Sequence, residues 1–277
     1  MQLTILGSAA AEGVPALWCE CEACRHALEH GGKDLRRRCS YLLDRDTMID
    51  FGPDAFWQMT HFKIDLRTIK RLIFTHSHED HLNAVDLLWR HAGYSVVHHP
   101  INVFGNRWVF NRLVQAMIFG VEETGLDTLK INPAVACSGR EIRDDDLELL
   151  PIAANHTHHE EALNYLLQRN GRSLLIVNDS GYWKESSWDL IRRRHADAVI
   201  LDSTCGIKYP DARDNHMGCN TVVAFRDRLL ELEVIDRDTP VYANHFSHNG
   251  IFNHEELCAF YEPHRIQVGY DGLTIEV

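Results

Sequence analysis

The sequence predicts a mixed α/β protein whose sheets are covered by helices. Short apolar runs of strand length alternate with longer stretches of helical spacing along the whole chain. No Pro-, Gly- or Ser-rich linker divides the 277 residues, and no short-period repeat is present. The 45% hydrophobic and 25% charged residues exclude collagen-like, fibrous and disordered classes. We therefore expect a single α/β domain over residues 1–277.

The expected strands are short apolar runs bounded by polar or turn-forming residues. In chain order they are Gln2–Leu6, Ser40–Leu43, Met48–Phe51, Arg71–Thr75, Ile101–Phe104, Leu149–Ala153, Leu163–Leu167, Ser173–Val177, Ala198–Asp202, Pro240–Ala243 and Gln267–Gly269. Asn170-Gly171 lies between two of these runs and is a strong hairpin signal.

The expected helices lie between these strands, where apolar residues recur three or four positions apart. They are Ala55–Phe62, Leu82–His91, Arg107–Phe119, Glu185–Arg194, Thr221–Glu231 and His254–Tyr261. Asn253 precedes the last helix and predicts an N-cap, because its side chain can accept a hydrogen bond from the first helical turn.

The charge balance limits the classes of partner. The chain has 28 Lys and Arg against 40 Asp and Glu, a net charge of −12, which disfavours binding along nucleic acid or on an anionic membrane. No apolar run approaches the roughly 18 residues of a membrane span. The start MQLTILGSAAAEG lacks a basic signal-peptide region, so we expect a cytoplasmic protein. The eight cysteines then indicate thiols or metal ligands rather than disulfides.

The strongest local signal is a histidine cluster, Thr75-His76-Ser77-His78-Glu79-Asp80-His81, directly after an apolar strand. In an extended segment residues two apart point to the same side, so His76 and His78 can bind one metal. Asp80 and His81 point elsewhere, which suits a second metal nearby. Imidazole and carboxylate ligands suit zinc, manganese or iron. An H-E-x-x-H zincin motif is excluded, because His81 comes one position too early.

The pattern H-x-H-x-D-H after a strand resembles the metallo-β-lactamase superfamily, whose fold is a four-layer αββα sandwich. The resemblance implies further ligands on strand-end loops: His156 for the first metal, Asp179 as the bridging carboxylate and His245 for the second metal. His158 and His159 compete with His156, which we prefer because it directly follows its strand and Asn.

A narrower resemblance, spread over essentially the whole chain, is to the PhnP-type phosphodiesterases. It is carried by the segments 7–15 (GSAAAEGVP), 19–24 (CECEAC), 37–40 (RRCS), 214–216 (DNH) and 268–272 (VGYDG). The best-known member of that family hydrolyses a phosphoribosyl cyclic phosphate during phosphonate breakdown, and close relatives act on other phosphodiesters. The resemblance thus implies a small cyclic phosphodiester as substrate, most simply phosphoribosyl 1,2-cyclic phosphate.

The spacing C-x-C-x-x-C supplies three thiolates, Cys19, Cys21 and Cys24, which is one ligand short of a tetrahedral zinc site. The PhnP-type resemblance places the fourth ligand at His248, and we expect a structural zinc there. The remaining cysteines have no such spacing and are expected to pack in the interior; they are Cys39, Cys137, Cys205, Cys219 and Cys258.

The expected mechanism uses two divalent ions, Mn or Zn, bridged by Asp179 and a water. Such ions lower the pKa of the water, so that a metal-bridging hydroxide attacks the phosphorus. The resemblance makes His216 the proton donor to the leaving group, while Asp80 serves the catalytic site as a metal ligand rather than as a free base. Asp202 and Asp50 end two strands and are expected to orient metal-binding histidines.

Two features have open roles. The run Arg36-Arg37-Arg38 is either a solvated charged loop or a contact to a substrate phosphate remote from the reacting one. The stretches His91–Pro100 and Gly120–Leu129 are extra length relative to the compact PhnP pattern, and we expect them to shape the mouth of the pocket.

Other functions fit the same ligand set. A tRNA-processing nuclease of the superfamily needs a basic RNA-binding surface, for which the −12 balance offers no obvious source. A thioester or lactone hydrolase shares the metal site. A redox or non-catalytic metal-binding role belongs to a different class. We expect a small phosphodiester as partner, with neither membrane nor nucleic acid, and a homodimer on resemblance alone.

Overall fold

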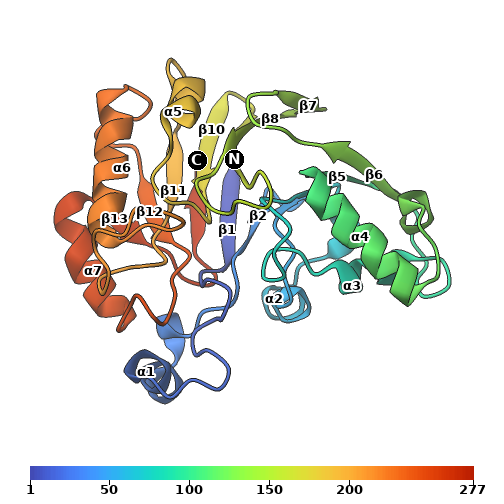
Figure 1. Cartoon of the computed structure of the whole chain (residues 1–277), viewed down its shortest axis with the longest axis horizontal. Helices are drawn as coiled ribbons and strands as arrows, with labels where there is room; N and C mark the ends of the chain where they lie inside the picture. Colours follow the sequence, from blue (N-terminus) through green and yellow to red (C-terminus); the bar gives the residue numbers. More distant parts are fainter.

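The computed structural model describes residues 1–277 as two seven-stranded sheets that face each other, with helices on both outer faces (Figure 1). In Figure 1, α5, α6 and α7 stand on one side and α2, α3 and α4 on the other, while α1 lies apart at the bottom. This confirms the predicted αββα sandwich. The two chain ends are neighbours, since the amide of Val277 donates to the carbonyl of Met1 over 2.8 Å.

The first sheet is antiparallel at one end and parallel at the other. In spatial order its strands are β14 (Thr274–Glu276), β1 (Gln2–Gly7), β2 (Ser40–Leu43), β3 (Thr47–Ile49), β4 (Arg71–Ile73), β5 (Ile101–Gly105) and β6 (Ile131–Val135). Strands β3 to β6 are parallel. The loops that follow these parallel strands therefore leave from one edge of the sheet.

The second sheet has the same mixed character. In spatial order its strands are β13 (Ile266–Val268), β12 (Val241–Asn244), β11 (Ala198–Asp202), β10 (Arg172–Val177), β9 (Leu163–Arg169), β8 (Leu147–Ala153) and β7 (Ile142–Asp144). The hairpin predicted at Asn170-Gly171 joins β9 to β10, and both residues have positive φ, 54° and 74°, as a type I′ turn requires.

Seven α-helices lie outside the sheets. They are α1 (Glu22–His30), α2 (Ala55–Phe62), α3 (Ala84–Leu87), α4 (Arg107–Gly120), α5 (Glu185–Ile191), α6 (Cys219–Glu231) and α7 (His254–Tyr261). The predicted N-cap of α7 is confirmed, because the side chain of Asn253 accepts a hydrogen bond from the Glu256 amide over 2.9 Å. No helix is long and apolar enough to cross a membrane.

Three apolar clusters hold the layers together. One fills the space between the sheets and includes Leu3, Ile73 and Leu174. The second packs helices against the outer face of the first sheet, and the third does the same for the second sheet, where Trp188 of α5 packs on Phe225 of α6 at 4.5 Å between ring centroids. Because both faces of each sheet are covered, the central strands are continuous apolar runs, which is what made them predictable.

The sequence missed α1 and the three strands β6, β7 and β14. β6 is an edge strand with largely exposed side chains and a proline, so it carries no apolar run. β7 and β14 have three residues each, too few to show a period. The helix predicted over Leu82–His91 is shorter, because α3 ends at Leu87 and continues only as a 3₁₀ turn, Leu88–Arg90.

Candidate metal centre

Five strand ends meet at one edge of the sandwich and bring the predicted ligands together. The histidine cluster follows β4, His156 follows β8, Asp179 follows β10, Asp202 ends β11 and His245 follows β12. The predicted ligands form two four-residue groups, in each of which all ligating atoms lie within 4.8 Å of one another, and a third group at the same spacing joins Asp179, Asp202, His216 and His245. Asp179 belongs to all three groups.

The first group consists of His76, His78, His156 and Asp179. Nε2 of His76 lies 3.2 Å from Oδ2 of Asp179, and Nε2 of His156 lies 3.7 Å from the same oxygen. His156 Nε2 is also 3.3 Å from Nδ1 of His78. The two neighbouring histidines, His158 and His159, are exposed and lie outside the group. The structure thus brings together the residues expected for the first metal.

The second group consists of Asp80, His81, Asp179 and His245. His81 Nε2 lies 3.0 Å from an oxygen of Asp80 and 2.9 Å from Oδ2 of Asp179. His245 Nε2 lies 2.9 Å from the other oxygen, Oδ1, of Asp179. Each carboxylate oxygen of Asp179 therefore points to a different histidine of this group, and Oδ2 also points toward the first group.

Two of the ligand residues have a strained backbone conformation. Asp179 and His245 have φ values of 45° and 62°, in the left-handed region that non-glycine residues rarely adopt. Such a conformation costs of order 1–3 kcal/mol and persists where the surroundings enforce it, as they do at functional sites. Gly52 is needed at the same edge, because a Cβ there would lie 2.0 Å from the carbonyl oxygen of Asp80.

Two aspartates fix the orientation of the histidine rings. Asp50 lies 2.6 Å from Nδ1 of His81 and accepts the Thr75 amide over 2.8 Å. Asp202 lies 3.4 Å from Nδ1 of His245, which also contacts the Thr204 hydroxyl at 2.8 Å. Because Nδ1 of each ring is engaged, Nε2 is the atom available to a metal. Both aspartates were expected in this role from their positions at strand ends.

The buried polar atoms at this centre fit divalent cations. Nε2 of His76, His81 and His245, together with Oδ1 of Asp179, are buried and make no hydrogen bond of acceptable geometry. Buried polar groups without partners are rare and costly. Burial alone would raise the pKa of Asp179, but the neighbouring His245 and His81 lower that pKa well below its usual value. A dense set of imidazoles and ionised carboxylates with orphaned atoms is the donor set that Zn²⁺ or Mn²⁺ takes.

His216 lies beside the second group, on the loop between β11 and α6. Its Nδ1 is 3.0 Å from Oδ2 of Asp202 and 3.7 Å from Oδ1 of Asp179. Burial lowers the pKa of His216, but the charge of Asp202 and the hydrogen bond to it outweigh burial, so that the pKa is raised. Glycine is required at position 181 for the loop that carries His216 to pack against it, because a Cβ there would lie 2.3 Å from the carbonyl oxygen of Arg213.

A hollow of about 410 Å³ opens onto these residues. Besides the ligands and His216, it is lined by side chains that the sequence did not single out, notably Glu12, Cys205, Tyr209 and Asn249. Glu12 falls within the segment that resembles the PhnP type, but no local pattern marks the others. No Lys or Arg lines this hollow.

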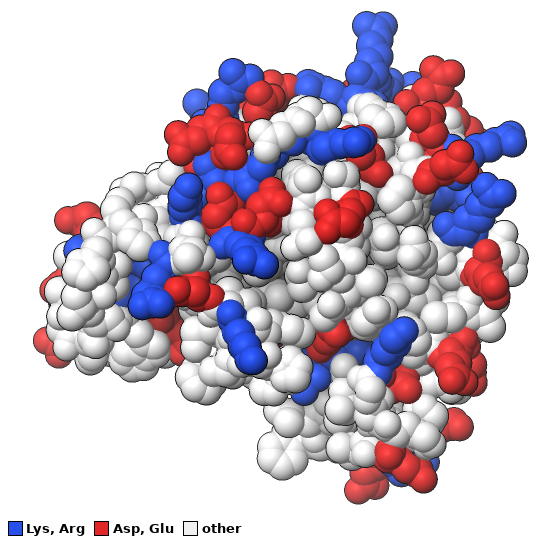
Figure 2. Space-filling model, turned by 180° about the vertical axis from the view of Figure 1, so that it is seen from behind, with Lys and Arg blue, Asp and Glu red and all other residues white.

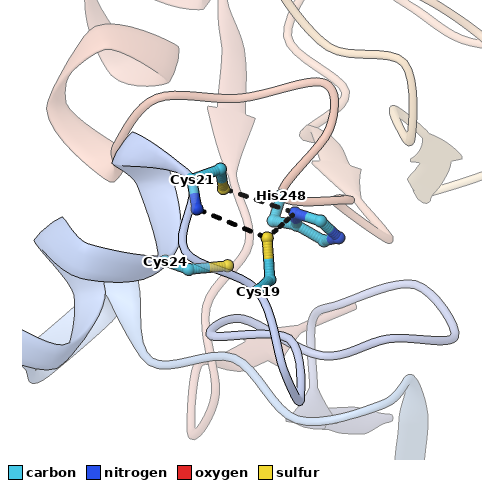
Figure 3. Close-up of side chains that lie close together, drawn as sticks. All are labelled: Cys19, Cys21, Cys24 and His248. Carbon is cyan, nitrogen blue, oxygen red and sulfur yellow. Dashed lines mark hydrogen bonds between the residues drawn. The ribbon is translucent and has the colours of Figure 1, made fainter.

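A second cluster joins the loop before α1 to the loop after β12 (Figure 3). The Sγ atoms of Cys19 and Cys21 each lie 3.5 Å from Nδ1 of His248, and Cys24 completes the group within 4.8 Å. Burial raises the pKa of the Cys21 thiol, but hydrogen bonds from the Cys24 backbone and from His248 bring that pKa down to about 6. Three thiols and one imidazole match a tetrahedral zinc site.

The other five cysteines differ in burial. Cys39 and Cys219 are buried, as expected, and Cys205 and Cys258 are partly buried. Cys137 is exposed, so the expectation that it packs in the interior is wrong. It follows β6 at the open edge of the first sheet, where nothing covers it.

The arginine run has a structural role that neither alternative foresaw. Arg36 is 2% exposed and donates to the Ser8 hydroxyl and to the Gly269 carbonyl, so it does not belong to a solvated loop. Arg37 pairs with Asp271 at 3.6 Å, and Arg38 pairs with Asp54 at 2.9 Å. Sequence could not show this, since Asp271 and Gly269 are more than 230 positions away along the chain.

The two extra stretches also differ from expectation. Neither His91–Pro100 nor Gly120–Leu129 contributes to the hollow at the metal centre. Ser95 and Val97 instead line a separate apolar hollow on the outer face of the first sheet, together with residues of α2 and α3. The prediction that these stretches shape the mouth of the metal pocket is therefore wrong.

Comparison with known proteins agrees with this geometry. A family model described as Beta-lactamase superfamily domain matches residues 45–234, which include the ligands from His76 to Asp179 and end before His245. A protein called octanoyltransferase from Porphyromonas gingivalis is 34% identical over 90 residues, which are 31% of this chain and 17% of that protein. The chain thus spans only a small part of this curated relative.

Solved structures share the whole fold. A diphosphatase from the PhnP family superposes with a TM-score of 0.76 at 21% identity, over 100% of this chain and 97% of that one. Zn²⁺-bound PqqB from Methylobacterium extorquens gives 0.75 at 18% identity, over 100% of both chains. The short form of human tRNase Z gives 0.65 at 16% identity, over 100% and 99%. At these identities the likeness establishes the fold alone.

Proposed function

The chain belongs to the β-lactamase superfamily, and we propose that it is a metal-dependent phosphodiesterase acting on a small phosphodiester. The observation that carries the proposal is the pair of four-residue groups sharing Asp179, with His216 held beside them by Asp202. The sequence resemblance to the PhnP-type phosphodiesterases, from the first strand to the last residues, supports phosphoryl over carbonyl chemistry. Residues beyond 234 supply His245 and His248, so we propose residues 1–277 as one working unit.

The residues of the centre have separable tasks. Divalent ions, Zn²⁺ or Mn²⁺, supply Lewis-acid polarisation of a phosphoryl oxygen and activation of water when bound. The shared carboxylate of Asp179 keeps the two groups in a fixed relation, while Asp50 and Asp202 hold the rings of His81 and His245. Asp80 acts as a ligand of the second group, since its carboxylate points at His81.

His216 is the proposed general acid. Its Nδ1 is committed to Asp202, so Nε2 is the nitrogen able to protonate the departing alkoxide. Its place on the wall of the 410 Å³ hollow, next to the shared Asp179, puts that proton beside the reacting phosphorus of a bound ester. The thiol cluster with His248 is proposed as structural zinc that holds the N-terminal loop beside the centre.

The sequence resemblance nominates phosphoribosyl 1,2-cyclic phosphate, an intermediate of phosphonate breakdown, as the first substrate to test. The protein is stripped of metal, reloaded with Mn²⁺ or Zn²⁺, and incubated with this compound and with bis(p-nitrophenyl) phosphate. Phosphorus NMR and nitrophenolate release report hydrolysis. The proposal predicts that at least one phosphodiester is hydrolysed. Turnover of thioesters or lactones alone, with the ions verified as bound, would contradict it.

A nuclease acting on tRNA precursors is less well supported. On the face drawn in Figure 2, Lys and Arg side chains stand among Asp and Glu rather than in a continuous basic patch. Binding along an RNA backbone needs such a patch, because phosphate contacts dominate the affinity. We expect no mobility shift of a tRNA precursor at physiological salt, and a shift by the holoprotein would reinstate this alternative.

A further inference from the structure

A second hollow, of about 490 Å³, adjoins the hollow at the metal centre. The two share Ala11 and Glu12 on the loop after β1. The outer hollow is further lined by Leu17, Trp18 and Arg38. His248 lies on its wall, while the next residues of the same loop, Asn249 and Gly250, line the metal hollow. The two hollows therefore meet at Glu12, on the side of the metal centre that faces Trp18.

Trp18 stands out among the large apolar side chains. It is 98% exposed, the highest value of any large hydrophobic residue, so its indole contributes almost nothing to the core. Its φ of 67° lies in the left-handed region, which costs a residue with a side chain roughly 1–2 kcal/mol. The chain thus holds a costly conformation that presents an aromatic face to solvent and gains no packing in return.

The loop that carries Trp18 is held in place on both sides. The Cys19 amide donates to the Ala16 carbonyl over 3.2 Å, and the Ala16 amide donates to Sγ of Cys24 over 3.2 Å. Cys19 itself belongs to the thiol cluster with His248. The backbone at Trp18 is therefore tied to the loop that carries the metal-centre ligand His245, three residues before His248.

The charges around the outer hollow do not favour a second phosphate. Its one cation, Arg38, already makes two hydrogen bonds from its guanidinium to Asp54, at 2.9 and 3.0 Å. Glu12 adds a negative charge between the two hollows, and its Oε1 accepts a hydrogen bond from the side-chain Nδ2 of Asn249 over 3.4 Å. A carboxylate accepts hydrogen bonds from hydroxyl or amino groups and repels a phosphate.

We propose that the outer hollow is a subsite for a flat, uncharged aromatic group of the substrate, such as the base of a nucleoside phosphodiester, which stacks on Trp18. Glu12 accepts hydrogen bonds from hydroxyl groups between the ring and the reacting phosphate. This rests on the proposed phosphodiesterase function and narrows its substrate class. A sugar phosphate without an aromatic ring, such as phosphoribosyl 1,2-cyclic phosphate, leaves Trp18 unused and brings its second phosphate near Glu12.

The test uses two esters with the same methyl phosphodiester that differ only in the base: adenosine 5′-methyl phosphate and the corresponding 1-O-methyl-ribose 5-methyl phosphate. Hydrolysis by the metal-loaded protein is followed by phosphorus NMR. Stacking of a base on an aromatic side chain is worth about 1–3 kcal/mol. We therefore expect Trp18→Ala to lower the kcat/KM ratio of the adenosine ester over the ribose ester about tenfold, chiefly through KM, and Trp18→Phe to retain most of the ratio.

Phe119→Ala is the matched control, since Phe119 is 89% exposed and lines neither hollow. It should keep the wild-type ratio. An unchanged ratio in Trp18→Ala would overturn the subsite. So would a change of sedimentation mass in Trp18→Ala without a change of ratio, because Trp18 would then be a contact to another protein chain.

A readout that needs no turnover separates the two proposals. Saturation-transfer NMR detects contact between the holoprotein and the base protons of adenosine. If neither ester is hydrolysed, the phosphodiesterase proposal fails for this class, while adenosine contact that disappears in Trp18→Ala would still support the aromatic subsite. Absence of any adenosine contact in the wild-type protein would overturn the subsite.

Discussion

Two clusters of charged side chains lie at opposite ends of β4. They differ in what balances the negative charge of their aspartates. At the end of the strand, the metal centre gathers Asp80, Asp179 and Asp202 with six histidines and no Lys or Arg. At the start of the strand, Arg71 is 1% exposed and meets a ring of aspartates. Both clusters join the two sheets, but Asp179 and Asp202 are buried at the metal centre, whereas the aspartates around Arg71 stay partly exposed.

The arginine cluster supplies its own cations. Arg71 donates to Asp144, to Asp46 at 3.3 Å and to Asp146 at 3.1 Å. Arg169 of β9 donates to Asp44 at 2.9 Å and to Asp46 at 3.0 Å. Guanidinium groups match carboxylates in geometry and are always charged. The aspartates in the turns β2–β3 and β7–β8 are thereby neutralised by protein side chains.

The metal centre leaves its carboxylates and histidines without such a partner. Four of its buried polar atoms have no hydrogen bond, namely Nε2 of His76, His81 and His245 and Oδ1 of Asp179. The comparison distinguishes a structural cluster from a binding site. Where Arg side chains balance the aspartates, the cluster stabilises the fold. Where no Lys or Arg is present, we expect an ion from solution to balance the charge.

The largest expected effect comes from removing the shared carboxylate. Asp179→Ala takes away the one residue common to both groups, so metal binding at the centre and turnover should fall together, by about a thousandfold or more in kcat. Metal content by mass spectrometry and the rate on bis(p-nitrophenyl) phosphate check this. Full activity with both ions bound would remove Asp179 from the bridging role.

His216→Ala should leave metal content intact and slow hydrolysis by roughly 10²–10⁴-fold on esters with poor leaving groups. The loss should be much smaller with p-nitrophenolate, which departs without a proton. The measurement is the ratio of rates for an alkyl and a nitrophenyl ester. Equal losses on both esters would show that His216 acts on something other than the leaving group.

Arg71→Ala removes a central cation of the other cluster. It should lower the stability of the protein and leave metal binding unchanged. It leaves Asp144 without its cation and Asp46 with Arg169 as its remaining partner. Breaking a fully buried ion pair typically costs about 3–5 kcal/mol of unfolding free energy, and the partial exposure of the two aspartates places the expected loss at the lower end of that range. Metal stoichiometry of the folded protein should not change. Chemical denaturation measures the first quantity and mass spectrometry the second. A loss of bound metal without a loss of stability would contradict the separation of the two clusters.

Asp202→Asn should act more mildly, through the two histidines that Asp202 contacts at Nδ1. Substitution of such an outer partner costs typically 10–100-fold in metal affinity or activity. Titration of metal-free protein with Zn²⁺ gives the affinity. An Asp202→Asn protein with wild-type affinity and rate would show that Thr204 alone fixes the ring of His245.

The effect most remote from the site is a pH dependence of stability outside both clusters. Burial, then the positive charges of Arg36 and Lys33, hold the pKa of His254 at about 4. The unfolded chain binds a proton at this histidine near pH 6.5 and the folded chain only near 4, so stability falls as the pH drops between these values. The slope approaches about 1.4 kcal/mol per pH unit. His254→Gln should flatten this part of the curve, and an unchanged curve would contradict the assignment.

The sequence predicted the metal centre better than the arginine cluster for a physical reason. Ligands such as His76, His78 and Asp80 are close along the chain, and their spacing has meaning on a strand-end loop. Asp179 and His245 came from family resemblance, since a single residue after a strand carries little information. Arg71 meets Asp144 across 73 positions, which no local pattern encodes.

The same reasoning explains which strands could be predicted from the sequence and which could not. Central strands such as β10 and β11 are covered on both faces and appear as apolar runs, whereas the edge strand β6 does not. Trp18 was missed because exposure cannot be inferred for a single tryptophan in a loop. The outer hollow forms only when this loop meets Arg38 and the loop that carries His248.

The central claim is that ions take the place of the missing protein cations at the metal centre. Native mass spectrometry of metal-free protein reloaded with Zn²⁺ tests it most directly. We predict three bound ions in the wild-type protein, two at the His and Asp cluster and one at the thiols, and only the thiol-bound ion in Asp179→Ala. A wild-type protein that binds a single ion, lost on substitution of Cys21 but not of Asp179, would contradict the account.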